Sequence, residues 1–233
     1  MDAMLTVLKE GLPKLDFALP EERLTLLCRF AEAMLKQNQV MNLTAITEPE
    51  TVAKLHLLDS LTLLTVEDFP NKKVIDVGCG AGFPGVPVKI ACPTAKITLL
   101  DSLGKRMAWL ETVLPELGVE AECITARAEE AVVTRREQYD IATSRAVARL
   151  NILLELTAPY VKVGGKVLAM KGSAWKEELD EAKNAISRLG LKLETVQEFP
   201  IEGTAHAVIV LKKVSPTPAQ YPRRYAKIKQ FPL

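Results

Sequence analysis

The chain has 233 residues, 48% of them hydrophobic and 25% charged, which is enough for one full core and an appendage. It has no run of about eighteen or more apolar residues and no basic-then-apolar start, so we expect neither a membrane span nor a secretory leader. Its four cysteines form no C-x-x-C pair and have no nearby histidine partner. This argues against a metal site and favours reduced thiols in a cytoplasmic protein.

The net charge of +1 is unevenly distributed. No acidic residue follows Glu202, whereas six of the 30 basic residues do, and all 29 acidic residues lie in 1–202. A basic terminal segment on a mildly acidic body is typical of a surface that binds a polyanion. From charge alone, a solvated and poorly ordered terminus explains the pattern equally well.

Residues 1–65 have a helical pattern and are expected to form an extension packed on the core. Between Glu21 and Gln37, apolar side chains recur at three-and-four spacing, the stripe of an amphipathic helix. The run Thr-Glu-Pro-Glu at 47–50 has the form of a capping box with proline in the first turn. It predicts a helix that begins near Thr47 and continues through Leu61.

From residue 72 the pattern alternates between strands and helices. Apolar segments predict strands over 73–77, 96–101, 119–124, 139–144 and 165–170, with helices over roughly 85–91, 103–116, 128–134 and 148–160. This alternation is typical of βαβ units, which build a parallel sheet covered by helices on both faces.

A helix over about 174–189 and two final strands, 191–198 and 206–211, are expected next. The connection 200–204 is so short that these strands must be antiparallel. The result is the Rossmann-like α/β fold of class I methyltransferases, with a seven-stranded, mostly parallel sheet. We therefore expect a methyltransferase domain over 66–214 and a basic tail over 215–233, which its prolines should keep extended rather than helical.

The glycine-rich loop after the first predicted strand is the most informative segment. Gly78, Gly80 and Gly82 let the backbone approach a ligand closely. Asp76 precedes them at the carboxyl end of the strand, where open α/β sheets bind ligands. Residues 80–85 also match the dinucleotide pattern G-x-G-x-x-G, but a lone match is weak evidence.

The charge of Asp76 decides between a dinucleotide and S-adenosylmethionine as the cofactor. A carboxylate at Asp76 would repel the phosphates of a dinucleotide, which prefer a helix amino terminus. The same carboxylate attracts the sulfonium and ammonium groups of S-adenosylmethionine. The spacing therefore favours S-adenosylmethionine, with a purely structural turn as the lesser alternative.

A second acid, Asp101, ends the next predicted strand. A carboxylate at this place accepts hydrogen bonds from the ribose hydroxyls in nucleotide-binding βαβ units. Asp101 is equally suited to cap the helix predicted after it, and the two roles are compatible.

The residues after the fourth parallel strand narrow the methyl acceptor. Residues 143–146, Thr-Ser-Arg-Ala, lack the Asn/Asp-Pro-Pro-aromatic run of many enzymes that methylate exocyclic amines, and no cysteine is there for methylation at carbon. A ring nitrogen such as guanine N7 has an available lone pair and needs little beyond in-line placement. No acid or base is therefore assigned, and Arg145 is the one candidate positioning residue.

Four segments resemble the family of small-subunit (16S) ribosomal RNA guanine-N7 methyltransferases, also called glucose-inhibited division protein B. They are Met-Asn-Leu-Thr at 41–44, His-Leu-Leu-Asp-Ser at 56–60, the loop from Asp76 through Gly85, and Ser-Arg-Ala-Val-Ala at 144–148. Tyr-Pro-Arg-Arg at 221–224 also matches many members, although some relatives lack this tail.

The resemblance implies S-adenosylmethionine-dependent methyl transfer to N7 of one guanosine in 16S rRNA. It implies that the cofactor is held by Gly78, Phe83, Ala128, Glu129 and Arg145. Phe83 would offer an apolar wall and Glu129 would lie near the adenine amino group. The arginine fork suits either the cofactor carboxylate or an RNA phosphate. Without the resemblance, Glu129 is more simply a first-turn helix acid.

Candidate RNA contacts lie in three places. His56 and Asp59 share one helix face and could border the pocket with Asn42, although such a pair is often structural. Lys171 ends the fifth strand at the ligand edge of the sheet. In the tail, basic residues interleaved with tyrosines suit RNA backbone and bases, namely Arg223, Arg224 and Lys227.

We therefore expect a cytoplasmic, monomeric enzyme whose partner is small-subunit rRNA or the 30S particle, without a membrane partner. One alternative is another methyltransferase of the same fold with a small-molecule or protein substrate, against which the basic tail argues. A nicotinamide-dependent oxidoreductase is disfavoured by Asp76. The remaining alternative is a non-catalytic, RNA-binding ribosome assembly factor.

Overall fold

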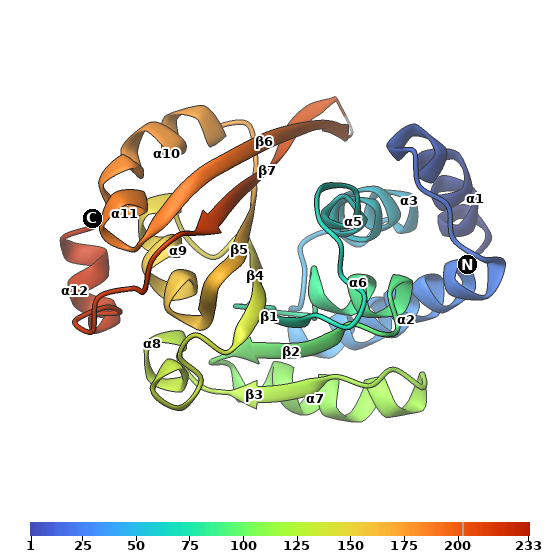
Figure 1. Ribbon diagram of the computed structural model, residues 1–233. Helices are drawn as coiled ribbons and strands as arrows, with labels where there is room; N and C mark the ends of the chain where they lie inside the picture. Colours follow the sequence, from blue (N-terminus) through green and yellow to red (C-terminus); the bar gives the residue numbers. More distant parts are fainter. Residues whose placement is uncertain (202) are drawn as a thin grey trace.

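A seven-stranded sheet of order β3-β2-β1-β4-β5-β7-β6 forms the centre of the protein, with helices on both faces (Figure 1). The computed structural model describes residues 1–201 and 203–233, and all of their side chains except that of Thr204. The strands are β1 Lys73–Val77, β2 Lys96–Asp101, β3 Glu122–Thr125, β4 Tyr139–Arg145, β5 Val161–Lys171, β6 Leu191–Ile201 and β7 Thr204–Lys213.

The helices alternate with the strands after residue 72, as the sequence predicted. The α-helices before and after that residue are α1 Asp2–Gly11, α2 Glu21–Met41, α3 Pro49–Val52, α4 Asp59–Leu61, α5 Leu63–Val66, α6 Gly85–Ala91, α7 Gly104–Glu116, α8 Ala128–Ala131, α9 Leu150–Thr157, α10 Trp175–Glu181, α11 Lys183–Arg188 and α12 Tyr225–Gln230. Within the described ranges, no helix is both long and apolar enough to span a membrane.

Strand pairing brings the ligand-side ends of three strands together. β1 pairs in parallel with β2 and β4, so that Asp76 lies in register with Leu99 on one side and Thr143 on the other. β3 and β5 extend the parallel part, whereas β7 runs antiparallel to both β5 and β6. The predicted seven-stranded, mostly parallel sheet is therefore confirmed, and the site lies at the carboxyl ends of β1, β2 and β4.

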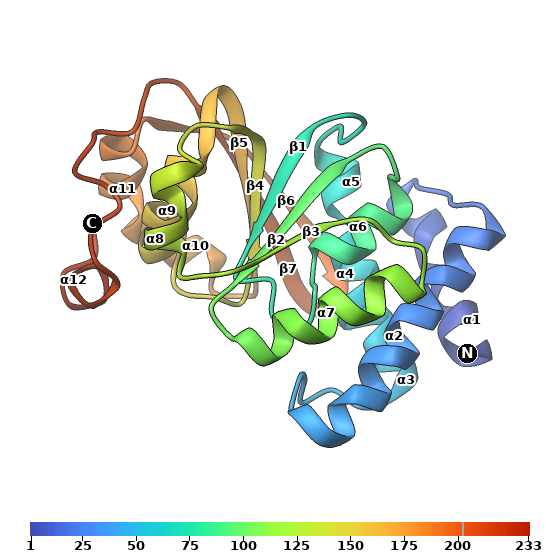
Figure 2. The same ribbon diagram turned by 90° about the horizontal axis from the view of Figure 1, so that it is seen from below.

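Alternate strand residues bury into two hydrophobic clusters, one on each face of the sheet. In β5, Leu168 and Met170 face the cluster shared with α2, α6 and α7, whereas Val167 and Ala169 face the cluster shared with α9 and α11. Figure 2 shows these helix groups on opposite sides of the strands. Burial on both faces explains why these strands have continuous apolar sequences.

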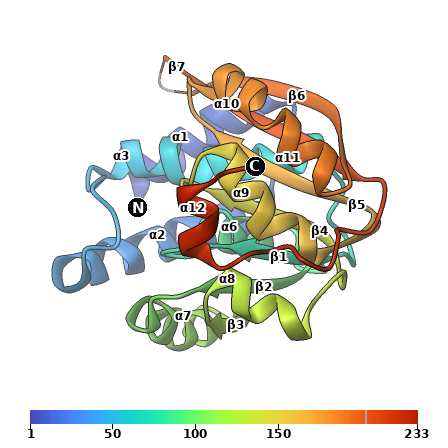
Figure 3. The same ribbon diagram turned by 90° about the vertical axis from the view of Figure 1, so that its left-hand side faces the viewer.

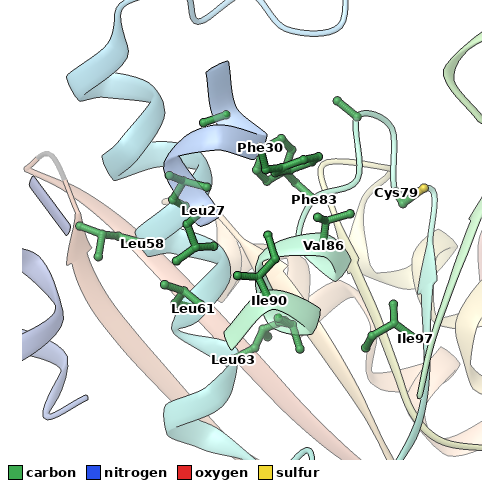
Figure 4. Packing of buried hydrophobic residues seen from close by; sticks show 14 of the residues in the cluster. Leu27, Phe30, Leu58, Leu61, Leu63, Cys79, Phe83, Val86, Ile90 and Ile97 are labelled. Carbon is green, nitrogen blue, oxygen red and sulfur yellow. The ribbon is translucent and has the colours of Figure 1, made fainter. Parts of the chain in front are cut away.

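The amino-terminal helices belong to the first of these clusters. Phe30 of α2 is fully buried, and its ring centroid lies 5.3 Å from that of Phe83, which follows the glycine loop (Figure 4). The stripe predicted to end at Gln37 continues as helix to Met41. The helices before residue 66 thus pack directly behind the glycine loop.

The start of the next helix differs from the predicted capping box. Glu48, not Thr47, is the N-cap: its carboxylate accepts hydrogen bonds from the backbone N–H groups of Glu50 and Thr51. The chain then forms a π-helical turn over Ala53–Leu58 before α4. A longer carboxylate side chain reaches the same amide groups that a threonine hydroxyl would, so the motif was displaced by one residue.

Two further expectations were wrong in detail. The third strand begins at Glu122 rather than residue 119, because the N–H of Val119 still bonds to Leu114 at the end of α7. The tail is not extended throughout: α12 forms from Tyr225. The three prolines lie before this point, and the next, Pro232, follows the helix, so residues 225–230 keep their N–H donors.

Candidate functional site

A cavity of about 310 Å³ lies at the carboxyl ends of β1 and β2, and we call it the glycine-loop cavity. Four of the nine predicted cofactor residues line it: Gly78, Asp101, Ala128 and Glu129. The helical tail contributes Tyr225, one of the interleaved tyrosines that the sequence analysis assigned to RNA and not to the cofactor. Strand ends, the start of α8 and the start of α12 therefore share one hollow.

Gly78 makes the close turn that opens this cavity. Its φ is +74°, and a Cβ at this position would lie 2.4 Å from Cγ2 of Val147. Any side chain would therefore be strained twice, by the backbone conformation and by the contact. The loop leaves this space open because Gly78 has no side chain.

Asp101 fastens the loop to the end of β2. Its Oδ2 accepts a hydrogen bond from the N–H of Gly80 (2.9 Å), and its Oδ1 accepts one from the N–H of Leu103 (2.8 Å). The second bond supports the start of α7, as the capping alternative predicted. Each carboxylate oxygen has a further lone pair, so these bonds leave Asp101 able to accept from a ligand.

Asp76 is fully buried and does not line the glycine-loop cavity. Its Oδ2 accepts a hydrogen bond from the N–H of Gly85 (2.8 Å), while Oδ1 has no hydrogen-bond partner among the described residues. Burial raises the pKa of Asp76 to about 7, against the opposing effect of that hydrogen bond. The carboxyl thus holds the glycine loop against β1.

The remaining loop residues pack inward. Gly82 adopts a φ of +92° and faces Val86, Leu110 and Phe30. The Phe83 ring is almost completely buried and lies 4.9 Å from the ring of His56. Of the cofactor candidates, Asp76, Gly80, Gly82, Phe83 and Arg145 therefore lie outside the lining of the glycine-loop cavity.

A second cavity, of about 570 Å³, lies beside the first and is centred on Arg145. We call it the Arg145 cavity. Three of the predicted RNA-contacting residues line it, His56, Asp59 and Lys171, together with His206 of β7. The His-x-x-Asp segment therefore lies at the carboxyl ends of β4 and β5, whereas Asn42, with which it was expected to border the pocket, does not line this cavity.

Arg145 connects the sheet to the helices before residue 66. Its guanidinium donates to the carbonyl of Leu55 (2.7 Å), to Oδ2 of Asp59 (2.9 Å) and to Nδ1 of His56 (3.2 Å). It also lies over the Phe83 ring, 5.4 Å from the centroid. These contacts fix the plane of the guanidinium.

The surroundings of His56 determine its charge. Nδ1 of His56 lies 3.2 Å from Nη2 of Arg145 and 3.2 Å from the carbonyl oxygen of Leu55, and Nε2 lies 2.8 Å from Oγ1 of Thr44. Burial and then the charge of Arg145 lower the pKa of His56 to about 4. His56 is therefore neutral near pH 7.

Asp59 joins the side chains of Arg145 and His206. Its Oδ1 lies 2.9 Å from Nδ1 of His206, opposite the oxygen that accepts from Arg145. Burial alone would raise the pKa of Asp59, but the bond to His206 and the charge of Arg145 lower it overall. The same bond raises the pKa of His206.

Lys171 is also engaged within the protein. Its ammonium contacts Oε2 of Glu178 (2.8 Å) and the carbonyl of Ala148 (2.5 Å), and only 9% of the residue is exposed. Burial lowers the pKa of Lys171, against the raising effect of Glu178. Lys171 thus positions the segment after β4 at the wall of the Arg145 cavity.

The two cavities share their wall at Ala146 and Val147. Ala146 has a φ of +57°, a conformation that costs energy in a residue with a side chain. This turn after β4 borders both cavities, so ligands in the two would lie next to each other beside it.

The other predicted RNA residues lie outside both cavities. Arg223 is held within the protein: its guanidinium donates to both carboxylate oxygens of the fully buried Glu155. The side chains of Arg224, Lys227 and Asn42 are exposed. Charge pattern alone could not separate Arg223 from its neighbours, because its partner lies 68 residues away.

Two site residues were not found from the sequence. His206 lies within an apolar strand that looked structural, and its approach to Asp59 depends on the β7 pairing. Asn38 sits in α2, and its Oδ1 accepts from the N–H groups of Leu43 and Thr44 to hold the segment that reaches His56. His206 lies 147 residues from Asp59, a separation that no local pattern covers, whereas Asn38 acts on residues only five and six positions later.

Comparison with known families gives a match over most of the chain. The model of the GidB family, described as rRNA small subunit methyltransferase G, matches residues 23–207. The protein named Ribosomal RNA small subunit methyltransferase G in Alkaliphilus metalliredigens is 43% identical over 224 residues, covering 94% of each chain. The protein of that name in a Thermoanaerobacter species is 44% identical over 211 residues, covering 88% of each.

Solved structures with low sequence identity share the fold. The 16S rRNA (adenine(1408)-N(1))-methyltransferase of Catenulisporales acidiphilia is 15% identical, with a TM-score of 0.53 over 64% of this chain and 88% of that one. The [4+2]-cyclase SpnF is 14% identical, with a TM-score of 0.54 over 69% and 82%. Because a cyclase and a methyltransferase share this fold, the fold alone does not settle the reaction.

Proposed function

The chain belongs to the GidB family, rRNA small subunit methyltransferase G, and on that premise we propose that it transfers a methyl group from S-adenosylmethionine to N7 of a guanosine in small-subunit (16S) rRNA. We further propose that it does so in the cytoplasm, as a monomer acting on the RNA or the 30S particle. The observation that carries the proposal is the pair of adjoining cavities, one beside the glycine loop and one around Arg145.

The residues of the glycine-loop cavity fit S-adenosylmethionine. The cradle at Gly78 would be filled by any Cβ, and Asp101 has lone pairs left for ribose hydroxyls. Glu129 lies at the far side, at the start of α8. We assign Gly78 to the methionine end, Asp101 to the ribose, and Ala128 with Glu129 to the adenine; when bound, the cofactor supplies an electrophilic methyl group on sulfur.

Asp76 supports this site indirectly. With a pKa of about 7 and no exposed surface, it cannot act as a free counter-charge at the cavity wall. It instead holds Gly85, and with it the start of α6, against β1. We therefore assign Asp76, Gly80, Gly82 and Phe83 to the shape of the loop rather than to direct contact.

The Arg145 cavity is suited to a purine base. Two of its polar groups, Arg145 and His206, are fixed by Asp59, so they present donors without having to be ordered on binding. The lone pair of guanine N7 is available at neutral pH, and no residue has to remove a proton before transfer. Catalysis then consists of holding N7 in line with the methyl group at the place where the two cavities adjoin, beside Ala146 and Val147.

RNA outside the target base would be held by exposed cations. Arg224 and Lys227 of the tail are exposed. Arginine and lysine at such places neutralise phosphates, which makes binding salt-dependent. An unpaired loop of rRNA is the expected target, because unstacked bases can enter a cavity.

Methyl incorporation tests the proposal. Purified protein, radiolabelled S-adenosylmethionine and 30S subunits from a strain lacking this enzyme should give one labelled site in 16S rRNA. Cleavage of that RNA by borohydride and aniline should map it to an N7-methylguanosine. Label in protein or in no product would contradict the proposal, and binding of RNA without transfer would favour an assembly factor.

Arg145→Lys tests the second cavity separately from the first. Lysine keeps the charge but loses the planar fork that joins Leu55, His56 and Asp59. We expect kcat to fall on the order of a hundredfold, since misplacement of reacting groups by about 1 Å has that effect. Affinity for S-adenosylhomocysteine, measured by calorimetry, should change less than about threefold. If kcat and the affinity for S-adenosylhomocysteine fell by the same factor, the two cavities would have to be regarded as one site.

A further inference from the structure

The carboxyl-terminal tail, residues 215–233, reaches the glycine-loop cavity although it lies outside the part of the chain that the family model matches. From the end of β7 it crosses the face covered by α9 and α11 and ends as α12, which lies in front of α9 and beside α8 (Figure 3). Ile228 of α12 is fully buried, so the helix is packed onto the body.

Polar anchors hold the tail before the helix. The guanidinium of Arg136 donates to the backbone carbonyls of Thr217, Pro218 and Tyr221 (2.7–3.1 Å). The hydroxyl of Thr217 donates to the carbonyl of Leu189 (2.9 Å). These backbone carbonyls bond to Arg136 in place of water, and the path of the tail is therefore fixed.

The last anchor lies immediately before α12. Arg223 donates to Glu155 from its backbone N–H (2.8 Å) and from Nε (2.8 Å) and Nη2 (2.6 Å), and Glu155 has no exposed surface. The Arg223 guanidinium also lies 5.8 Å from the centroid of the Tyr221 ring, which is itself buried. A bidentate, charge-assisted contact of this kind sets both position and orientation.

Tyr225 is the residue that this anchoring delivers to the cavity. It is the first residue of α12, two positions after Arg223, and is only partly buried. It lines the glycine-loop cavity together with Asp101 and Glu129, and it also lines the adjoining surface groove that contains Arg127 and Glu129. Its ring therefore stands at the Glu129 end of the cavity, between the interior and the solvent.

We propose that Tyr225 is a cofactor-binding residue, and that the docked tail forms the wall of the cofactor site at the adenine end. This inference rests on the assignment of S-adenosylmethionine to the glycine-loop cavity. An aromatic ring at the rim contributes apolar area and a face for stacking on a base at little entropic cost. The tail thereby becomes part of the cofactor site rather than only an RNA-binding appendage.

Calorimetric titration with S-adenosylhomocysteine tests the assignment. Tyr225→Ala should raise Kd about tenfold, the range expected for loss of one aromatic–base contact. Tyr225→Phe keeps the ring and should bind within about twofold of the unsubstituted protein. Gln230→Ala, an exposed change on the same helix that touches neither cavity, should bind as the unsubstituted protein does.

Three controls separate the outcomes. Thermal unfolding without ligand should be the same for Tyr225→Ala and Gln230→Ala, which shows that the tail is still docked. Asp101→Ala should weaken the binding of S-adenosylhomocysteine, whether or not Tyr225 contributes to it. Wild-type affinity in Tyr225→Ala would overturn the role of the tail alone, whereas no binding by the unsubstituted protein would overturn the cofactor assignment and this inference with it.

Discussion

The two terminal regions of the chain are attached to the sheet by different forces. The amino-terminal helices are held by apolar packing: Met4, Leu8 and Phe30 are fully or almost fully buried in the same cluster as the strands. The carboxyl-terminal tail is held mainly by directed polar contacts from Arg136 and Glu155 to its backbone and to Arg223. The two regions reach opposite ends of the site in this way.

The difference explains what each region can do. Apolar packing places the π-helical turn, which carries His56, and Asp59 just after it against Arg145. Polar anchors fix a path for the tail but bury few side chains, so most of α12 stays exposed. The first region therefore shapes the Arg145 cavity, and the second lines the glycine-loop cavity and carries exposed cations on α12. Both statements can be tested by substitution.

Phe30→Ala should have the largest effect on stability. The ring is fully buried against Phe83 and Trp109, so its removal leaves a cavity behind the glycine loop. We expect a loss of about 4 kcal/mol in the free energy of unfolding, measured with urea. Val40→Ala, a highly exposed change on the same helix, should stay within about 0.5 kcal/mol. A loss below about 1 kcal/mol for Phe30→Ala would contradict apolar attachment.

Arg223→Ala should come next. It leaves the carboxylate of Glu155 buried without its ion-pair partner, at an expected cost of about 3 kcal/mol. Arg224→Ala removes a neighbouring, exposed arginine and should cost less than about 0.5 kcal/mol in the same urea experiment. Equal effects of the two substitutions would show that the tail is not held through Glu155.

His56→Gln should make the protein less sensitive to acid. The pKa of His56 is lowered from 6.5 to about 4, so below pH 6.5 the unfolded chain binds a proton that the folded protein excludes. Stability is therefore lost as the pH falls from 6.5 towards 4, and the substitution removes this contribution. Between pH 7 and 4.5, we expect the variant to lose about 2 kcal/mol less than the unsubstituted protein. If the variant and the unsubstituted protein lost the same stability over this pH range, His56 would accept a proton in the folded protein, which would contradict its lowered pKa.

Lys227→Ala should have the smallest effect, and only on RNA binding. The side chain is exposed on α12, so stability should not change. Loss of one phosphate contact should reduce the slope of log K against log salt concentration by about 0.7–0.9. Lys192→Ala, an exposed lysine on β6, is the matched control and should leave the slope unchanged. No difference between the two lysines would remove α12 from the RNA surface.

The sheet was predictable because its signal is local. Apolar runs such as Val74–Val77 and Ile97–Leu100 with glycine loops between them fix strand, turn and helix in order, and the short 200–204 connection fixes the final antiparallel pair. The meeting of Asp101, Gly78 and Glu129 followed from that topology. Cap and boundary positions were less certain, as Glu48 and Val119 show, because a single side chain or one retained turn decides them.

The roles of individual charges were not predictable. Arg223 and Lys171 looked available to RNA, but each pairs with an acid that only the tertiary structure brings near, Glu155 and Glu178 respectively. Asp76 looked like a counter-charge, yet its carboxyl points to the N–H of Gly85. Sequence places a residue at the correct edge of a sheet, whereas the direction of its side chain depends on packing from other elements.

A crystal structure with S-adenosylhomocysteine bound is the most direct test of the two-cavity site. Density for the ligand should fill the hollow beside Gly78, with the ribose at Asp101 and the adenine near Glu129 and Tyr225, leaving the space around Arg145 free. Ligand in the Arg145 cavity, or a phosphorylated nucleotide taken up at Gly78 instead, would contradict the assignment of these two cavities to donor and base.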